Sequence, residues 1–436
     1  MKYNLFLAVA LYLSHISISA AETTTECTVP SSIPTAPTES EWTTLRHQLA
    51  PQLQKCLNSS NYFALYGASL LNTGDISTAL EMLERSLLID PMNGSAQIDY
   101  AQALFQNGQL IAALQINQSI LDREDLPERI YDFLLSRQKL WDQFRFQDRY
   151  QFTLVQGYSS NLNNATLTRE HLVTLNDNAA VLSLRDEDLA QSGSYSNIGV
   201  STRFYELHDQ SIDAVKFDLK SRLSRLSEFD TDEFSIGFER ELEARAYRDT
   251  WELSAEHVQL GDSGLYSSVE GNYERYWTEY SSLTPYLKSE IRYADFHSNS
   301  RLDESSIGLV SGFVIGKLEN KIGIEAEITQ NFALKQRYGG DKTTLEGQIY
   351  WDTAFLNGRL ISRIGYLDSN DHDEYPLLAN GSKRRIYSRN ISVQYFYPIN
   401  NQLIAHAGYN YKKQRSNLSI FDIETKNIDL GLTFRF

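Results

Sequence analysis

The end of the chain constrains the fold more than any other stretch. Ile428, Leu430, Leu432, Phe434 and Phe436 are apolar and alternate with polar or small residues. Successive side chains of a β-strand point to opposite faces, so the pattern predicts a strand with one apolar and one polar face. Such a strand suits the wall of a barrel that has lipid outside and water inside.

The same alternation recurs backward along the chain as far as Arg149. It predicts an antiparallel transmembrane β-barrel of about fourteen strands over residues 148–436. The number is even, as it must be if both ends of the barrel chain lie on the periplasmic side. Two long polar insertions, 163–194 and 368–386, are expected to be extracellular loops. The expected strands start near residues 149, 196, 212, 231, 247, 264, 283, 303, 320, 342, 358, 387, 402 and 425.

Four residues of the last strand match a barrel-assembly signal. Asp429, Gly431, Phe434 and Phe436 follow the order polar, any, Gly, two of any kind, aromatic, any, aromatic. A soluble β-sandwich would show the same alternation, but it has no reason to end on an aromatic residue. The pattern favours insertion by the barrel-assembly machinery into the outer membrane of a Gram-negative bacterium, with outer-membrane lipid around the barrel.

The first residues have the features of a secretory signal peptide. Lys2 is basic, residues 5–13 form a short apolar run, and small residues at 19–21 offer a cleavage site after which the mature chain starts. The alternative is a buried core helix. We therefore expect a signal peptide over 1–21, followed by a disordered arm over 22–40, which is rich in Thr, Ser and Pro.

The chain has only two cysteines, Cys27 and Cys56. In an oxidising periplasm they can form a disulfide that ties the arm to the first helix. The alternative is two unpaired thiols. Because no histidine lies near them, a zinc site is not expected.

Between the arm and the barrel, apolar residues recur at helical spacing, which predicts a helical domain over 41–147. Within it, pairs such as Tyr66 and Tyr100 lie 34 residues apart, the period of the tetratricopeptide (TPR) repeat. Two generic helical hairpins are the alternative. The residues expected to pack the repeats or end their helices are Gly67, Gly74, Ala79, Pro91, Gly108 and Ala113.

Charge and motifs narrow the function. A net charge of −16 argues against nucleic acid as a partner. The sequence has no GxSxG elbow, P-loop, HExxH or paired Cys/His ligands, so we expect neither an enzyme nor a bound cofactor. The histidines are scattered, and His406 on the expected inner face is the only one that attracts attention.

The junction of the two parts carries a resemblance to a known family. A Leu-Pro-Glu stretch at 126–128 opens a helix, and the first strand ends in a stretch with Gly157, Asn161, Asn163 and Ala165. This arrangement resembles the Slam family, the surface lipoprotein assembly modulators of the type XI secretion system. The resemblance covers residues 60–436, although the helical domain here is shorter.

The resemblance implies a periplasmic TPR domain and a fourteen-stranded barrel that together export a lipoprotein or secreted protein cargo without nucleotide hydrolysis. Two other classes remain: an exopolysaccharide export porin with a periplasmic TPR domain, and a lipid-modifying enzyme of the outer membrane. An inner face dense in aromatics and acids would favour sugar. The strand that ends at Phe436 should pair with the first strand, and this seam is where we expect transport.

Overall fold

The computed structural model describes residues 27–30, 37–175, 178–278, 282–317, 319–378 and 381–436. The chain divides into two compact units, 1–141 and 142–436, which are described separately here. The expected signal peptide lies outside the described residues, as does most of the expected arm. None of the helices described is long and apolar enough to span a bilayer.

The first unit is helical, and its helices begin and end where the sequence provides caps. Thr38 caps the first helix with its side chain, so the helix begins at Glu39 rather than at Glu41 as expected. Gly74 and Gly108 adopt φ values of 82° and 81°, which glycine accommodates in the tight turns between helices. The elements are α1 (Glu39–Leu49), η1 (Ala50–Lys55), α2 (Ser60–Asn72), α3 (Ile76–Ile89), α4 (Gly94–Gln106), α5 (Leu110–Leu121) and α6 (Glu128–Asp142).

Small residues let the helices of this unit approach closely. A Cβ at Gly67 would overlap the side chain of Leu83, so α2 and α3 cross at van der Waals contact only because residue 67 is glycine. Ala79 and Ala113 are fully buried. Pro91 follows the end of α3, where its missing N–H cannot continue the helix.

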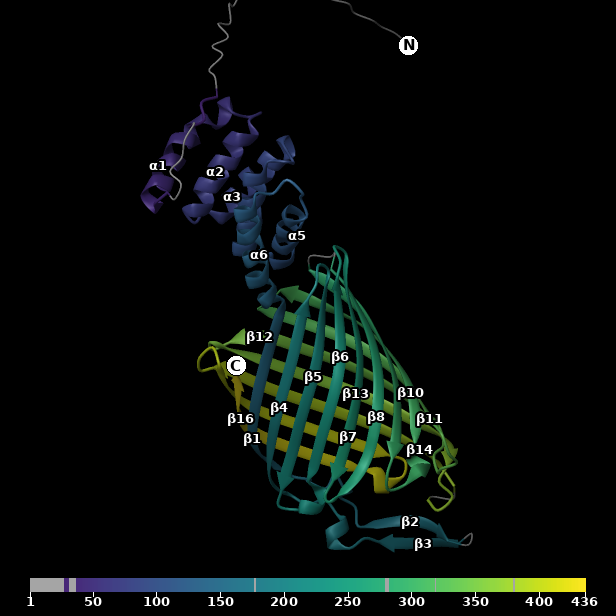
Figure 1. The fold of residues 1–436 in the computed structure, drawn as a ribbon. Helices are drawn as coiled ribbons and strands as arrows, with labels where there is room; N and C mark the ends of the chain where they lie inside the picture. Colours follow the sequence, from purple (N-terminus) through teal and green to yellow (C-terminus); the bar gives the residue numbers. More distant parts are fainter. Residues whose placement is uncertain (1–26, 31–36, 176–177, 279–281, 318, 379–380) are drawn as a thin grey trace, which may run out of the picture. The chain divides into compact units, whose positions relative to one another are not determined.

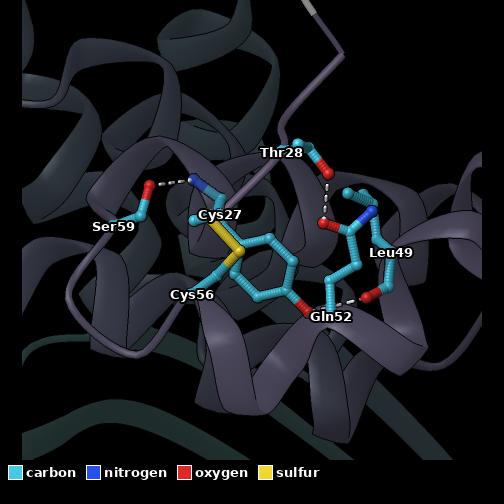
Figure 2. Close-up of a disulfide and its surroundings, with 7 residues drawn as sticks. Cys27, Thr28, Leu49, Gln52, Cys56 and Ser59 are labelled. Atoms are coloured by element: carbon cyan, nitrogen blue, oxygen red, sulfur yellow. Dashed lines mark hydrogen bonds between the residues drawn. A yellow bond between two sulfur atoms is a disulfide. The ribbon is translucent and has the colours of Figure 1, made fainter. Parts of the chain in front are cut away.

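Cys27 and Cys56 form a disulfide that joins the segment before α1 to the end of η1 (Figure 2). The hydroxyl of Thr28 donates to Gln52 Oε1 at 2.8 Å, and the hydroxyl of Tyr62 donates to the carbonyl of Leu49 at 2.9 Å. The segment around Cys27 is therefore held against α1, η1 and α2.

A buried arginine lies among the apolar residues of α6. Of these apolar residues, Leu134 and Trp141 are buried, whereas those at 130, 133 and 140 are exposed. Arg137 is also buried: its Nε donates to Asn117 Oδ1 at 2.8 Å and its guanidinium lies 4.6 Å from the Trp141 ring centroid. A charged side chain is thus part of the packing of α6.

Asp99 on α4 faces this arginine in the same partly buried region. Burial raises the pKa of Asp99 to about 6, although the positive charge of Arg137 acts in the opposite direction. Burial also lowers the pKa of Arg137 to about 10, so the guanidinium stays charged at neutral pH. The carboxyl group is therefore the member of this pair that titrates in the physiological range.

The second unit is a closed antiparallel barrel, which confirms the expected fold class (Figure 1). In the part of the chain that the structure describes, fourteen strands make the wall. They are β1 (Phe146–Ser159), β4 (Gly193–Leu207), β5 (Ser211–Ser224), β6 (Thr231–Glu243), β7 (Tyr247–Leu260), β8 (Ser263–Trp277), β9 (Leu283–Phe296), β10 (Glu304–Lys317), β11 (Asn320–Ala333), β12 (Lys342–Phe355), β13 (Gly358–Glu374), β14 (Lys383–Pro398), β15 (Leu403–Ser416) and β16 (Ile423–Arg435).

The barrel differs from expectation in three places. Its first strand begins at Phe146 rather than near residue 149, because polar residues at the rim of the barrel obscure the alternation there. The expected loop 368–386 is wrong: β13 runs to Glu374 and β14 resumes at Lys383. The expected loop 163–194 contains a hairpin of β2 (Glu170–Leu175) and β3 (Asn178–Ser183), which Figure 1 shows outside the barrel wall.

The alternation separates an apolar exterior from a polar interior. On β16, Ile428 and Leu430 are 61% and 65% exposed on the outer face, whereas inward-facing Thr433 is only 8% exposed. The two ends of the barrel also differ. Turns at the end where β1 begins and β16 finishes are short, such as 208–210 and 356–357. Connections at the other end are mostly longer, up to 160–192, although only 261–262 join β7 to β8 there. We call these the short-turn end and the long-loop end.

Asp99 gives the helical unit a testable pH dependence. A carboxyl whose pKa is raised by folding stabilises the fold at low pH and loses that contribution as pH rises through about 6. Asp99→Asn removes the titrating carboxyl group and should therefore remove this pH dependence. From pH 4.5 to pH 7.5, the unfolding free energy of the wild type should fall by about 2 kcal/mol relative to that of the variant. Urea titrations of the full chain, followed by helical circular dichroism, measure it. Parallel pH profiles for the two proteins would contradict the assignment.

Candidate functional site

The barrel closes where β1 pairs with β16, and we call this ladder the seam. Its register runs from Gln151 opposite Arg435 to Ser159 opposite Asn427. Beyond it, Tyr150 and Phe436 exchange backbone hydrogen bonds, each 3.0 Å long. On its other side, β1 pairs with β4 along its whole length. Among the described ladders of the barrel wall, the seam is the shortest.

Two glycines of the seam strands make room for side chains that lie flat on the inner wall. A Cβ at Gly431 would overlap the imidazole of His406, which stands directly opposite on β15. A Cβ at Gly157 would overlap the ring of Tyr195, directly opposite on β4. The glycine of the expected assembly signal and the glycine of the junction motif therefore have the same packing role.

The remaining residues of the expected assembly signal divide between the two faces of β16. Phe434 and Phe436 are exposed on the outer face at the short-turn end, with Phe436 67% exposed. Asp429 points inward, against Gly408 of β15. The structure thus places aromatic residues where the membrane interface is expected and a carboxylate in the lumen.

The junction motif holds the long-loop end of the seam together. Asn161 donates from Nδ2 to the carbonyls of Ala165 at 2.9 Å and of Glu424 on β16 at 3.2 Å. Its Oδ1 accepts from the Ala165 N–H at 3.1 Å. Asn163 binds the far end of the same loop, donating to the carbonyl of Leu189 and accepting from the N–H of Gln191.

The loop that follows is tied to two other loops at this end. His171 is buried and its Nδ1 lies 2.9 Å from the hydroxyl of Ser419, in the β15–β16 connection. Thr174 donates its N–H to the carbonyl of Leu377, in the β13–β14 connection. His171 was not predicted from the sequence, because a lone histidine within a polar insertion carries no pattern.

Inside the barrel, a cavity of about 470 Å³ lies along the seam, and we call it the seam cavity. Amide side chains are the most frequent type in its polar lining, five of eleven residues. Asn197 Oδ1, Asn427 Oδ1 and His406 Nε2 are buried there and have no hydrogen-bond partner among the described residues. Its lining consists of Gln151, Thr153, Val155, Tyr195, Asn197, Arg222, Gln394, Phe396, His406, Asn410, Asn427, Asp429 and Thr433.

The wall away from the seam has a different chemistry. Lys216 Nζ lies 2.9 Å from Glu239 and 2.5 Å from Glu252, so one lysine bridges three neighbouring strands. Tyr286 and Gln348 both donate to Glu325. Glu239, Glu252 and Glu325 thus have partners on other strands. The amide oxygens of Asn197 and Asn427 at the seam, like that of Asn272 on β8, accept no hydrogen bond from described residues.

No group of three or more His, Cys, Asp or Glu within the described residues is arranged to hold a metal ion. The seam cavity is lined mostly by amide and hydroxyl side chains. It therefore offers hydrogen-bond acceptors and donors to a polar chain.

A tetratricopeptide repeat family matches residues 70–134. No curated protein matches the chain. Solved outer-membrane barrels are similar in fold to about two thirds of it. A FadL homologue of Pseudomonas aeruginosa is 8% identical over 66% of this chain and 90% of its own, with a TM-score of 0.40.

OmpT of Vibrio cholerae is 8% identical over 67% of this chain and 98% of its own, with a TM-score of 0.38. An anion-selective porin from Comamonas acidovorans is 9% identical over 67% and 99%, with a TM-score of 0.35. At this level of similarity, the matches bear on neither substrate nor partner. The chain thus combines a helical unit that matches a tetratricopeptide repeat family with a closed antiparallel β-barrel.

Asn161 should stabilise closure of the seam. Asn161→Ala removes three hydrogen bonds and leaves buried carbonyls unpaired, which should cost about 2 kcal/mol of barrel stability. Urea unfolding in liposomes measures this cost. Asn401→Ala, at an exposed turn of the short-turn end, is the control and should leave stability within about 0.5 kcal/mol. Equal stability of the two variants would contradict the role given to Asn161.

Phe436 should matter for insertion rather than for backbone pairing. Phe436→Ser keeps the backbone hydrogen bonds to Tyr150 but removes the terminal aromatic, so most outer-membrane yield and heat-modifiable migration should be lost. Phe355→Ser is the matched control, because Phe355 is also an exposed aromatic at the short-turn end. Normal yield of Phe436→Ser would show that the last residue is not part of an assembly signal.

Proposed function

We propose that this protein is an outer-membrane translocator that assists export or surface display of a lipoprotein or secreted protein cargo. The observation that carries the proposal is the seam cavity, where buried amide oxygens accept no hydrogen bond from described residues. An extended polypeptide supplies a backbone N–H at every residue other than proline, which matches these acceptors. The free amide groups thus favour a polypeptide over a small ion as the transported species.

The seam supports a lateral opening as part of the route. Opening a barrel exposes backbone groups to lipid, and each unpaired group there costs several kcal/mol. The shortest ladder breaks the fewest hydrogen bonds when it opens. The seam is therefore the least costly place to open, and it lies beside the amide-lined cavity.

Topology supplies the orientation in this proposal. In bacterial barrels, the short turns face the periplasm and the longer loops face outward. The protein's own chain runs from α6 into β1 at the short-turn end, so the helical unit is periplasmic. TPR repeats stack into concave surfaces that bind proteins, and this unit would meet cargo before the barrel does. Insertion itself would depend on the barrel-assembly machinery.

An exopolysaccharide export porin is the second candidate, because the inner face carries tyrosines and glutamates together. Tyr276 and Tyr286 lie 5.0 Å apart between ring centroids, near Glu325. Tyr286, however, covers Gly312, and Tyr350 covers Gly323, so these rings pack against the wall. A ring buried in that way offers less surface for stacking on a sugar, and the protein-cargo proposal is the better supported.

A crosslink across the seam tests the proposed opening. The hydroxyls of Thr153 and Thr433 lie 3.2 Å apart across the seam, so cysteines at these positions can form a disulfide. The proteins that a deletion strain fails to display are the candidate cargo. Cells with oxidised Thr153→Cys/Thr433→Cys should also fail to display them. Protease shaving of intact cells measures exposure, and reduction should restore it.

The control is a crosslink in a ladder away from the seam. Thr344 and Ser369 have hydroxyls 3.0 Å apart between β12 and β13, and the same cysteine pair there should leave exposure unchanged. Normal export by the oxidised seam variant would contradict lateral opening. Unchanged surface proteins in the deletion strain, together with loss of capsule or biofilm polymer, would instead favour the polysaccharide candidate.

A further inference from the structure

The outer face of β14, β15 and β16 carries a group of basic side chains near the long-loop end. Each lies on the same face as an exposed apolar residue of its own strand, such as Ile391 on β14, Tyr409 on β15 and Ile428 on β16. They therefore face the membrane side of the wall and not the lumen. We call them the basic patch: Arg385, Arg389, Lys413, Arg415 and Lys426.

The patch has more positive charge than its neighbours neutralise. Arg385 pairs with Asp368 at 2.7 Å, Arg415 with Asp422 at 2.8 Å, and Lys413 and Lys426 share Glu424 at 3.6 Å and 3.3 Å. Five cations thus meet three carboxylates. Arg389 has no ion-pair partner among the described residues.

Exposure also differs between the two kinds of charge. The side chains of Lys413 and Arg415 are 41% and 58% exposed, whereas their carboxylate partners Glu424 and Asp422 are 24% and 15% exposed. The carboxylates are thus less accessible than the cations that they pair with. A group approaching from outside the wall therefore meets positive charge first.

The register places like charges together. Arg389 stands directly opposite Lys413 in the β14–β15 ladder. Like charges directly opposite each other in a sheet are destabilising, so an anion between them would remove an unfavourable interaction as well as add favourable ones. Arg and Lys together bind phosphate well, the guanidinium through paired hydrogen bonds and the ammonium as a point charge.

On the described parts of β6 to β12, the exterior at this end carries no such patch. Corresponding outward positions on the described parts of β6 to β12 carry acidic or uncharged side chains: Asp232, His257, Ser267, Asp295, Gln330 and Thr343. The local excess of positive charge also contrasts with the net charge of −16 for the whole chain. The patch is therefore a localised feature.

We infer that the basic patch binds the phosphate groups of a phosphorylated lipid in the outer leaflet. The inference uses the proposed orientation, in which the long-loop end faces outward, but it does not depend on export. Position supports a lipid over a soluble ligand, because the patch adjoins the apolar band of the wall and is flanked by tyrosines. Arg385 lies 4.7 Å from the Tyr387 ring and Lys426 lies 5.9 Å from the Tyr411 ring.

Native mass spectrometry of the full-length protein in detergent tests the inference, with bisphosphorylated lipid A as the probe. Arg389→Gln/Lys413→Gln should lower lipid A binding at least about tenfold, since two charge-assisted contacts are lost. Arg389→Lys/Lys413→Arg keeps both charges and should retain most of the binding. Heat-modifiable migration checks that each variant is folded.

A second control uses the other end of the exterior. Arg240→Gln removes an outward arginine at the short-turn end and should leave binding at the wild-type level. Full binding by the Gln double variant would overturn the inference. Equal binding of zwitterionic phosphatidylethanolamine, or displacement of lipid A by millimolar inorganic phosphate, would overturn it as well. Because export is not part of the readout, failure of the lipid-binding inference can be distinguished from failure of the proposed function.

Discussion

The structure of this protein depends on one constraint: inside a bilayer, each backbone N–H and C=O must find a partner within the protein. A sheet meets that requirement only by closing on itself, so the last strand must pair with the first. That closure joins residues nearly 300 positions apart, with Tyr150 and Phe436 exchanging backbone hydrogen bonds at its end. The seam is thus both a requirement of the fold and the shortest described ladder of the barrel wall.

Closure also explains why particular residues occur at the seam. Gly431 and Gly157 admit the rings of His406 and Tyr195, which would otherwise overlap a Cβ. Asn161 joins the end of β1 to the start of β16 through its side-chain amide. These residues carry no chemistry of their own. They hold a polar inner surface in place, and the proposed export depends on that surface.

The sequence predicted the architecture well because its signals are periodic. Alternation identified nearly every strand start within a few residues, and the terminal Phe436 identified the closing strand. It did not reveal the buried cation Arg137. It failed at 368–386, where polar residues belong to strands that extend beyond the apolar band. Periodicity reports which face is apolar, and at these positions burial and polarity do not coincide.

The candidate site was predicted less completely. The motif residues at 157, 161 and 431 were found. Tyr195, which covers Gly157, and the contact of His171 with Ser419 were missed, because they involve distant segments and form no local pattern. The basic patch was also missed, because its members are spread over three strands and only the register brings Arg389 opposite Lys413. Sites assembled by strand pairing become visible only once the pairing is known.

Hydrogen–deuterium exchange of the protein in lipid bilayers most directly tests whether the seam is the weakest ladder of the wall. The account predicts that backbone amides of Gln151–Ser159 and Asn427–Arg435 exchange faster than those of the β7–β8 ladder, because the seam opens at lower cost. Equal protection of the two ladders, or faster exchange at β7–β8, would contradict it.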